Sequence, residues 1–264
     1  MTEHEYNHVE DFPFWKGRLD EVMDSDKHSY DDFCNQIIKE GTNDHQDYRK
    51  LCLYLAKSIG HINGDPDIKY NVDNINEVCA YLNYWLNNEI GKFETPITNA
   101  IEFYKKLKTS ESHNPLNIDI CETRITNMDD TVFTNVEFLH NLFFNLHEYR
   151  NNFRKGDSVI CTYAKEISAL YKEPKNECIT ENSSPFCKKL NEFIIEYNST
   201  MSKTTCEGVP KKLQPFDEKP IPRQRSDERG DGASRSSIQD MQDEEKKEDR
   251  NNNVKLNNEY KQKK

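Results

Sequence analysis

The stretch NVDNINEVCAYLNYWLNNEI, residues 71–90, decides the fold of this chain. Its apolar residues recur every three or four positions, which places them on one stripe of an α-helix. These residues are Val72, Ile75, Cys79, Leu82, Leu86 and Ile90. Tyr81 and Trp85 flank the stripe, Asp73 is the expected N-cap, and Gly91 is the expected stop. Because no single neighbouring helix is long enough to cover so wide an apolar face, we expect this helix at the centre of a helical domain.

The same periodicity predicts further helices, whereas the alternation typical of strands is almost absent. The expected segments are 31–38, stopped by Gly41; 44–59, stopped by Gly60; 96–107, begun by Pro96; and 132–153, 159–170 and 186–197. Residues 63–66, Asn-Gly-Asp-Pro, indicate a turn. We therefore predict an all-α, disulfide-bearing bundle of about six to eight helices. Its core scaffold is expected to include Leu82, Trp85, Leu86, Leu139, Phe143, Leu146 and Tyr163.

Composition divides the chain into three parts. Residues 1–12 are polar and expected to fray, although the aromatic cluster that begins at Phe12 is expected to dock on the domain. Residues 13–206 form the expected helical, cysteine-containing domain. Residues 207–264, Pro-rich and then charged, hold 14 of the 36 basic and 13 of the 47 acidic residues, so the first 206 residues carry a net charge of −12. This last part is predicted to be a disordered tail, a solvated spacer in preference to an interaction arm.

The charge balance and hydropathy exclude several classes of partner. An acidic ordered region argues against nucleic acid, because phosphate binding needs a basic face. No apolar run approaches the roughly 18 residues that span a bilayer, so no transmembrane segment is expected. The first ten residues, MTEHEYNHVE, are too polar for a cleaved secretory signal.

The eight cysteines are the strongest chemical feature of the sequence: Cys34, Cys52, Cys79, Cys121, Cys161, Cys178, Cys187 and Cys206. None forms a C-x-x-C pair, so a zinc ribbon or a thioredoxin-type site is not indicated. An even number spread over a helical chain favours a disulfide framework in an oxidising compartment; the alternative is free thiols in a cytosolic core. Segments 31–38 and 44–59 read as an antiparallel hairpin with Cys34 and Cys52 level across it, which predicts that one pair and leaves the others open.

Catalytic and metal motifs are weak. His4-Glu5-Tyr6-Asn7-His8 matches H-E-x-x-H, in which two histidines hold zinc and Glu5 acts as general base. The motif sits at the terminus, close to Pro13 and with no third ligand at a family spacing, so we interpret it as a solvated turn. A zinc hydrolase remains a minor alternative.

Other candidate groups have simpler interpretations. His140 and His147 share a helix face but lack a third ligand, and we interpret them as packing residues. The acidic pairs Asp31-Asp32 and Asp129-Asp130 are expected to serve helix starts. Nucleotide-binding and nucleophile-elbow motifs are absent, so no catalytic residue, cofactor or metal is predicted. Sequons at Asn182 and Asn198 favour an extracellular route only weakly.

Five stretches together resemble one known family. They are CLYLAK from Cys52, VCAYLNYWL from Val78, LFFNLHEYRNNF from Leu142, CTYAKEISALY from Cys161, and the closing pair Cys178 and Cys187, the latter within FCKKLNEF. Over residues 10–206 this chain is similar to the Vir proteins, a branch of the Plasmodium interspersed repeat (PIR) family of malaria parasites.

The resemblance implies a helical, disulfide-bearing domain of a non-enzymatic variant antigen with a role in immune evasion and, for some members, adhesion to host cells. Its expected partner is host antibody or a host-cell receptor protein, and its expected location is the infected erythrocyte, exported to the cytoplasm or surface. Family members commonly carry a transmembrane helix after this domain, whereas residues 207–264 contain none, and no R-x-L-x-[EQD] export motif is found. The alternative is a soluble intracellular or exported scaffold that binds proteins through its tail, and the oligomeric state is left open.

Overall fold

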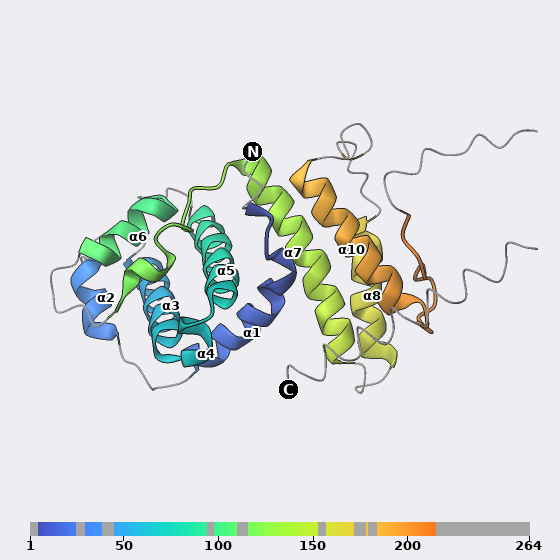
Figure 1. The fold of residues 1–264 in the computed structure, drawn as a ribbon, viewed down its shortest axis with the longest axis horizontal. Helices are drawn as coiled ribbons and strands as arrows, with labels where there is room; N and C mark the ends of the chain where they lie inside the picture. Colours follow the sequence, from blue (N-terminus) through green and yellow to red (C-terminus); the bar gives the residue numbers. More distant parts are fainter. Residues whose placement is uncertain are drawn as a thin grey trace, which may run out of the picture. The chain divides into compact units, whose positions relative to one another are not determined.

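A computed structural model describes residues 5–24, 30–38, 45–93, 98–109, 116–152, 157–171, 178 and 184–214 (Figure 1). Within these ranges every regular element is a helix, which confirms the all-α prediction. The elements are η2 (Val9–Asp11), α1 (Phe12–Met23), α2 (Asp31–Ile37), α3 (His45–Gly64), α4 (Pro66–Lys69), α5 (Val72–Gly91), α6 (Ala100–Thr109), η3 (Ile118–Cys121), α7 (Asp130–Asn151), α8 (Asp157–Tyr171) and α10 (Pro185–Met201). Residues 215–264, most of the expected tail, lie outside the described part.

Helix α5 occupies the central position that its sequence predicts. It contacts α1, α3, α4, α6, α7 and both 3-10 helices (Figure 1). Leu82 and Leu86 are fully buried. Trp85 is only partly buried and stacks on Tyr54 of α3, with ring centroids 3.9 Å apart. The wide apolar face of α5 is therefore covered by several helices, and Trp85 lies at the edge of the resulting core.

The two ends of α5 differ from the prediction. The N-cap is Asn71, not Asp73, because the Asn71 side chain accepts hydrogen bonds from the backbone N–H groups of Asp73 and Asn74. Val72 is 70% exposed and does not belong to the buried stripe, and its neighbours Asn71 and Asp73 are exposed as well. Gly91 is the last helical residue and has no positive φ, so it ends the helix without a left-handed turn.

Gly60 does not stop α3, which continues to Gly64 and buries Ile62 in the added turn. The reason for a glycine is close packing, because a Cβ at residue 60 would collide with the hydroxyl of Tyr30. Of the predicted turn at residues 63–66, only Asp65 lies between helices α3 and α4. Its side chain accepts a hydrogen bond from the N–H of Asp67 and caps α4.

Packing begins earlier than the expected boundary at residue 13. Tyr6 and Val9 are buried, and the Tyr6 ring lies 6.1 Å from that of Phe186 on α10. Two apolar residues among polar ones are too few to show a helical period, so the sequence suggested a frayed segment. The docking expected of the cluster that begins at Phe12 is observed for Phe12, Trp15 and Leu19, whereas Phe14 is half exposed.

Helix α7 contacts α1 and α5, and α8 and α10 pack against α7 (Figure 1). These three helices lie on the side of α5 opposite to α3 and α6. Leu139, Phe143 and Leu146 of α7 are buried as expected. The Phe143 ring meets Phe193 of α10 edge-on, with centroids 5.2 Å apart. Tyr163 of α8 packs at the edge of this core.

The ordered chain continues past the expected boundary at residue 206 and folds back on α10. Val209 and Leu213 are buried. The Tyr197 hydroxyl donates to the Pro210 carbonyl, and the Asn198 amide both donates to and accepts from the Leu213 backbone. The helical domain therefore includes the first residues assigned to the tail.

Two asparagines of α5 hold the extended segment that leads into α7. Asn83 accepts the N–H of Thr126 and donates to its hydroxyl. Asn87 donates to the Thr126 carbonyl and accepts the N–H of Met128. These side chains provide the hydrogen bonds that a neighbouring strand would provide elsewhere. They fix the connection between the central helix and α7.

We predict that Asn87→Ala lowers the free energy of unfolding by about 2 kcal/mol, because it leaves the Thr126 carbonyl and the Met128 N–H without their partner. Urea denaturation followed by circular dichroism measures the change. The matched control is Asn88→Ala, which removes only a contact with Glu89 on the same helix and should change stability by less than about 0.5 kcal/mol. Equal effects of the two substitutions would contradict the role assigned to Asn87.

Candidate functional site

All eight predicted cysteines are paired in four disulfides. The pairs are Cys34–Cys52, Cys79–Cys121, Cys161–Cys206 and Cys178–Cys187. The pairing predicted from the hairpin, Cys34–Cys52, is confirmed, with the two Cα atoms 5.7 Å apart. The other three could not be derived from sequence, because they depend on where separate helices meet.

Each disulfide fixes a local junction. The first joins α2 to α3, the second joins α5 to η3, the third ties α8 to the segment after α10, and the fourth closes a short loop at the start of α10. Two lie before α7 and two after it, so no disulfide crosses that helix. Covalent bonds stabilise each side of α7, and side-chain packing joins the two sides.

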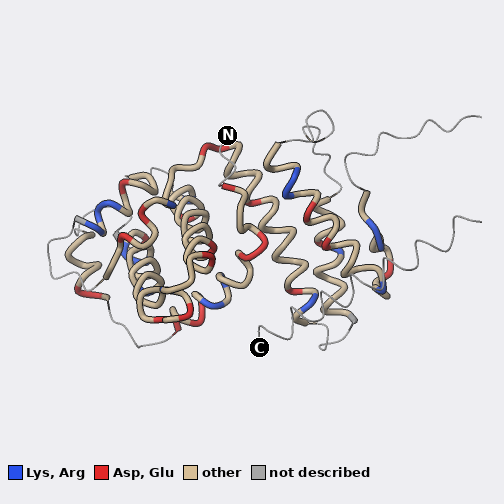
Figure 2. Tube along the Cα trace, viewed as in Figure 1, with Lys and Arg blue, Asp and Glu red and all other residues tan. Residues whose placement is uncertain are grey.

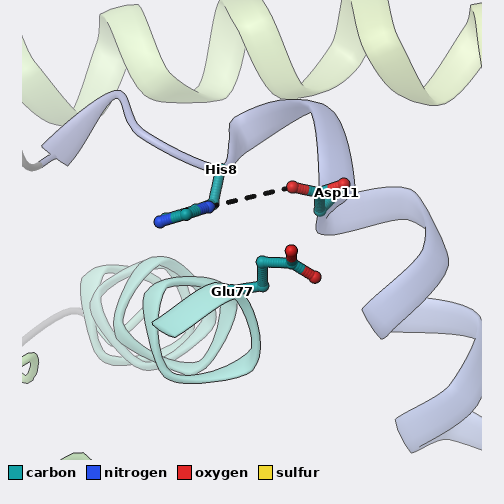
Figure 3. Close-up of side chains that lie close together, drawn as sticks. All are labelled: His8, Asp11 and Glu77. Atoms are coloured by element: carbon teal, nitrogen blue, oxygen red, sulfur yellow. Dashed lines mark ion pairs between the residues drawn. The ribbon is translucent and has the colours of Figure 1, made fainter. Parts of the chain in front are cut away.

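The H-E-x-x-H residues do not act as a group among the described residues. His4 lies outside them, and Glu5 lines a surface hollow together with Asn83, Arg124 and Thr126. His8 instead faces two carboxylates that the sequence analysis did not select. Asp11 follows on η2, and Glu77 comes from α5 (Figure 3).

The cluster of His8, Asp11 and Glu77 brings three metal-ligand types together. One ligand atom from each residue lies within 4.8 Å of the others, and all three residues are partly buried. His8 Nδ1 lies 3.9 Å from Asp11 Oδ2, too far for a hydrogen bond. The Trp15 indole donates to Glu77 Oε2 at 3.1 Å and orients that carboxylate.

The electrostatics of this cluster centre on Asp11. Burial, followed by the nearby negative charges of Glu77 and Glu10, raises the pKa of the Asp11 carboxyl to about 7, although Lys189 opposes the shift. Asp11 stands at the N-cap of α1, yet its side chain makes no capping hydrogen bond. The Asp11 carboxylate therefore lies beside that of Glu77 and does not cap the helix, which is the usual role of an aspartate at an N-cap position.

Sequence analysis missed Asp11 and Glu77 because they are far apart in the chain. The available signals were the three-residue spacing from His8 to Asp11 and the position of Glu77 on the polar flank of the central helix. Neither signal shows that Asp11 and Glu77 lie close together, because their proximity depends on the docking of the N-terminal segment on α5.

His140 has the packing role expected of it. It is 9% exposed, and its ring lies 5.1 Å from Tyr84, 6.0 Å from Phe12 and 6.0 Å from Phe144. Nδ1 is buried and has no hydrogen-bond partner in the part of the chain that the structure describes. Burial, with a smaller contribution from Lys16, lowers the pKa of His140 to about 4. His147, the second histidine of that face, instead contacts Asn151 through Nε2.

The acidic pairs serve structure as predicted. Asp129 caps α7 by accepting the N–H of Val132 at 2.9 Å, and Asp130 lies in the first turn. Asp31 forms an ion pair with Arg49 across the α2–α3 hairpin.

Of the two sequons, Asn182 lies outside the described residues. Asn198 uses both atoms of its side-chain amide to hold the Leu213 backbone. A glycan on Asn198 would have to displace that pair of hydrogen bonds, so this sequon has a structural role in the folded domain.

The architecture defines a class of protein: an all-α domain whose cysteines are all engaged in disulfides. No helix among the described residues has both the length and the apolar character needed to cross a membrane. The chain belongs to the Plasmodium vivax Vir protein family, whose model matches residues 17–264. This confirms the resemblance found in the sequence, and membership supports the general class of malaria variant antigens. No curated protein and no solved structure matches the chain.

The lowered pKa of His140 predicts acid sensitivity. The unfolded chain binds a proton on this residue below about pH 6.5, whereas the folded chain resists protonation down to about pH 4. The free energy of unfolding should therefore fall as pH decreases through this window, by up to roughly 3 kcal/mol from this residue. His140→Phe suits the aromatic surroundings and should remove much of the decrease. Urea denaturation at several pH values measures it. Burial also lowers the pKa of His147, but that imidazole is less buried, so His147→Gln should remove a smaller part of the decrease. An unchanged pH profile in His140→Phe would falsify this account.

The disulfides should stabilise the fold more when they close a longer stretch of chain, although the dependence on length is only logarithmic. Cys161 and Cys206 are 45 residues apart, whereas Cys178 and Cys187 are 9 apart. Restriction of the unfolded chain predicts losses of about 4 kcal/mol when the first pair is changed to alanine and about 2.5 kcal/mol for the second. Chemical denaturation of the two double variants tests the order. A larger loss for the Cys178–Cys187 pair would show that native-state effects dominate.

Proposed function

We propose that this protein is a non-enzymatic variant antigen, exported to the infected red cell, whose exposed surface is recognised by host antibody or by a host-cell receptor protein. Immune evasion is its proposed role, with adhesion to host cells as a further possibility of the same surface. Family membership supports the variant-antigen class, and we assign no reaction to the chain because the family is one of antigens.

The observation that carries the proposal is the complete pairing of the cysteines. All eight are in disulfides, and no free cysteine is left. Disulfides persist in oxidising compartments and at cell surfaces but are reduced in the cytosol. A domain stabilised in this way suits a route outside the reducing cytosol of the parasite. The Vir family assignment and the paired cysteines therefore support the same conclusion.

A corner between α4 and α5, residues 70–72, offers a recognition surface. Tyr70 is 79% exposed and Val72 is 70% exposed, although Ile68 just before them is buried and anchors the corner. The Lys69 ammonium lies 5.8 Å from the centroid of the Tyr70 ring. Tyrosines are enriched among the residues that dominate protein interfaces, and the core of the domain does not need either exposed side chain.

The charge pattern also suits a protein partner. Acidic and basic residues are interspersed over the described elements (Figure 2). Lys189, for example, pairs with Glu10 and Glu192, and Arg150 pairs with Glu196. A mixed surface of this kind favours specific protein contacts over binding to a polyanion.

The first test is the redox state of the chain in infected red cells. Alkylation before lysis, followed by mass spectrometry of the cysteine peptides, counts the free thiols. We expect mostly paired cysteines. Eight free thiols would overturn the proposal and favour the scaffold alternative, in which residues 207–264 capture a protein partner in pull-down experiments.

The second test addresses recognition. Antibodies isolated from infected hosts should bind the native full-length chain and lose binding after reduction and alkylation. Some should bind at least about tenfold more weakly to Tyr70→Ser/Val72→Ser. The control is Val159→Ser/Ile195→Ser, which removes exposed apolar side chains from α8 and α10. Failure of all such antibodies to bind the native chain would reject a role in immune recognition.

A further inference from the structure

The cluster of His8, Asp11 and Glu77 has the composition of a divalent metal site. It offers one imidazole nitrogen and two carboxylates from two elements that are distant in sequence (Figure 3). The side chains of His8 and Asp11 are 29% and 38% exposed, so an ion can reach the cluster from solvent. We propose that these three residues bind one Zn²⁺ ion, which joins the N-terminal segment to α5. This proposal does not depend on the antigen function.

Charge balance favours a divalent ion over a proton. Two carboxylates and a neutral imidazole carry a charge of −2, and one proton on any of the three groups leaves −1. One divalent cation neutralises the set. Lys189, the cationic side chain that acts on Asp11, is already engaged by Glu10 and Glu192.

The ligand types select the metal. Calcium and magnesium prefer oxygen donors, whereas zinc accepts imidazole nitrogen together with carboxylate oxygen. Bond lengths of about 2.0–2.1 Å around a tetrahedral ion place its donors roughly 3.4 Å apart. His8 Nδ1 and Asp11 Oδ2 are already 3.9 Å apart, and the three ligand atoms all lie within 4.8 Å of one another. Side-chain rotations that move the ligand atoms by about an ångström would bring them to the spacing of a tetrahedral zinc site.

Neighbouring groups prepare the ligands. Asp11 makes no helix-capping hydrogen bond, so its carboxylate is available to a metal. Trp15 donates to Oε2 of Glu77, which orients this carboxylate beside His8 and Asp11. A carboxylate that binds a metal is usually held in place by a hydrogen bond from a neighbouring side chain, and the Trp15 indole provides such a bond to Glu77. Three protein ligands leave the fourth position for water.

Zinc binding is tested on the oxidised, full-length chain, in which the disulfides leave no described thiol to compete. Isothermal titration with zinc chloride should show binding that depends on the cluster. His8→Asn, Asp11→Asn and Glu77→Gln should each weaken it at least about tenfold. Asparagine is chosen at residue 8 because the φ of 70° there is tolerated by asparagine better than by alanine. The matched control, His147→Asn, should bind as the unsubstituted chain does.

Tryptophan emission locates the ion. In a Trp85→Phe background Trp15 is the remaining tryptophan, and its hydrogen bond to Glu77 should make its emission change on zinc addition. Glu77→Gln should remove that change. Binding without any Trp15 response, or binding of equal strength in the three cluster variants, would assign the zinc to other residues and overturn the proposal.

Thermal unfolding separates a metal role from a merely structural one. Asp11→Asn removes the repulsion with Glu77, so without metal it should melt at a higher temperature than the unsubstituted chain. With saturating zinc chloride the order should invert, because only the unsubstituted chain gains the binding free energy. A lower melting temperature for Asp11→Asn in both conditions, or no zinc effect on the unsubstituted chain, would overturn the proposal.

Discussion

The rest of the structure depends on the need to cover α5. Its buried surface includes Leu82 and Leu86 on the predicted stripe and Tyr81 beside it, so the apolar face is too wide for one partner helix. Segments from both sides of α5 in the sequence therefore have to meet on it. The N-terminal segment contacts α5 through η2 and α1, and α6, η3 and α7, which follow α5 in the sequence, also contact it. Bringing such segments together costs conformational entropy, which the local cross-links reduce.

Disulfides and side-chain packing stabilise different parts of the fold around α7. Disulfides hold the junctions before and after α7, but none spans it. Cohesion across α7 comes from packing, such as Phe143 against Phe193, and from contacts of the N-terminal segment with α10. Tyr6 meets Phe186, and Glu10 pairs with Lys189. A segment that looks polar and dispensable in the sequence thus bridges the parts that the disulfides leave separate.

Periodicity was sufficient to predict most of the long helices, because it is a property of local sequence, whereas α1 and α4 were not predicted as helices. The errors lie where a long-range contact decides the local outcome. The glycine at residue 60 leaves room for the Tyr30 hydroxyl and does not end α3, and Val72 in the first turn of α5 is exposed. The Cys34–Cys52 pair was predictable from one hairpin, whereas the other pairs and the His8, Asp11 and Glu77 cluster depend on the tertiary arrangement. No spacing rule in the sequence could supply that arrangement.

A scaffold stabilised by internal contacts leaves its surface free to change. The fold rests on buried side chains, disulfides and side-chain-to-backbone hydrogen bonds such as those of Asn83 and Asn87. Substitutions at exposed positions away from such features usually alter stability by less than about 0.5 kcal/mol. Tyr70 and Val72 are exposed beside the buried Ile68, so residues that define the fold and residues open to recognition alternate within one corner. Variation of such surface residues would leave the helical core intact, and this tolerance is the physical condition that the proposed variant-antigen function has to meet.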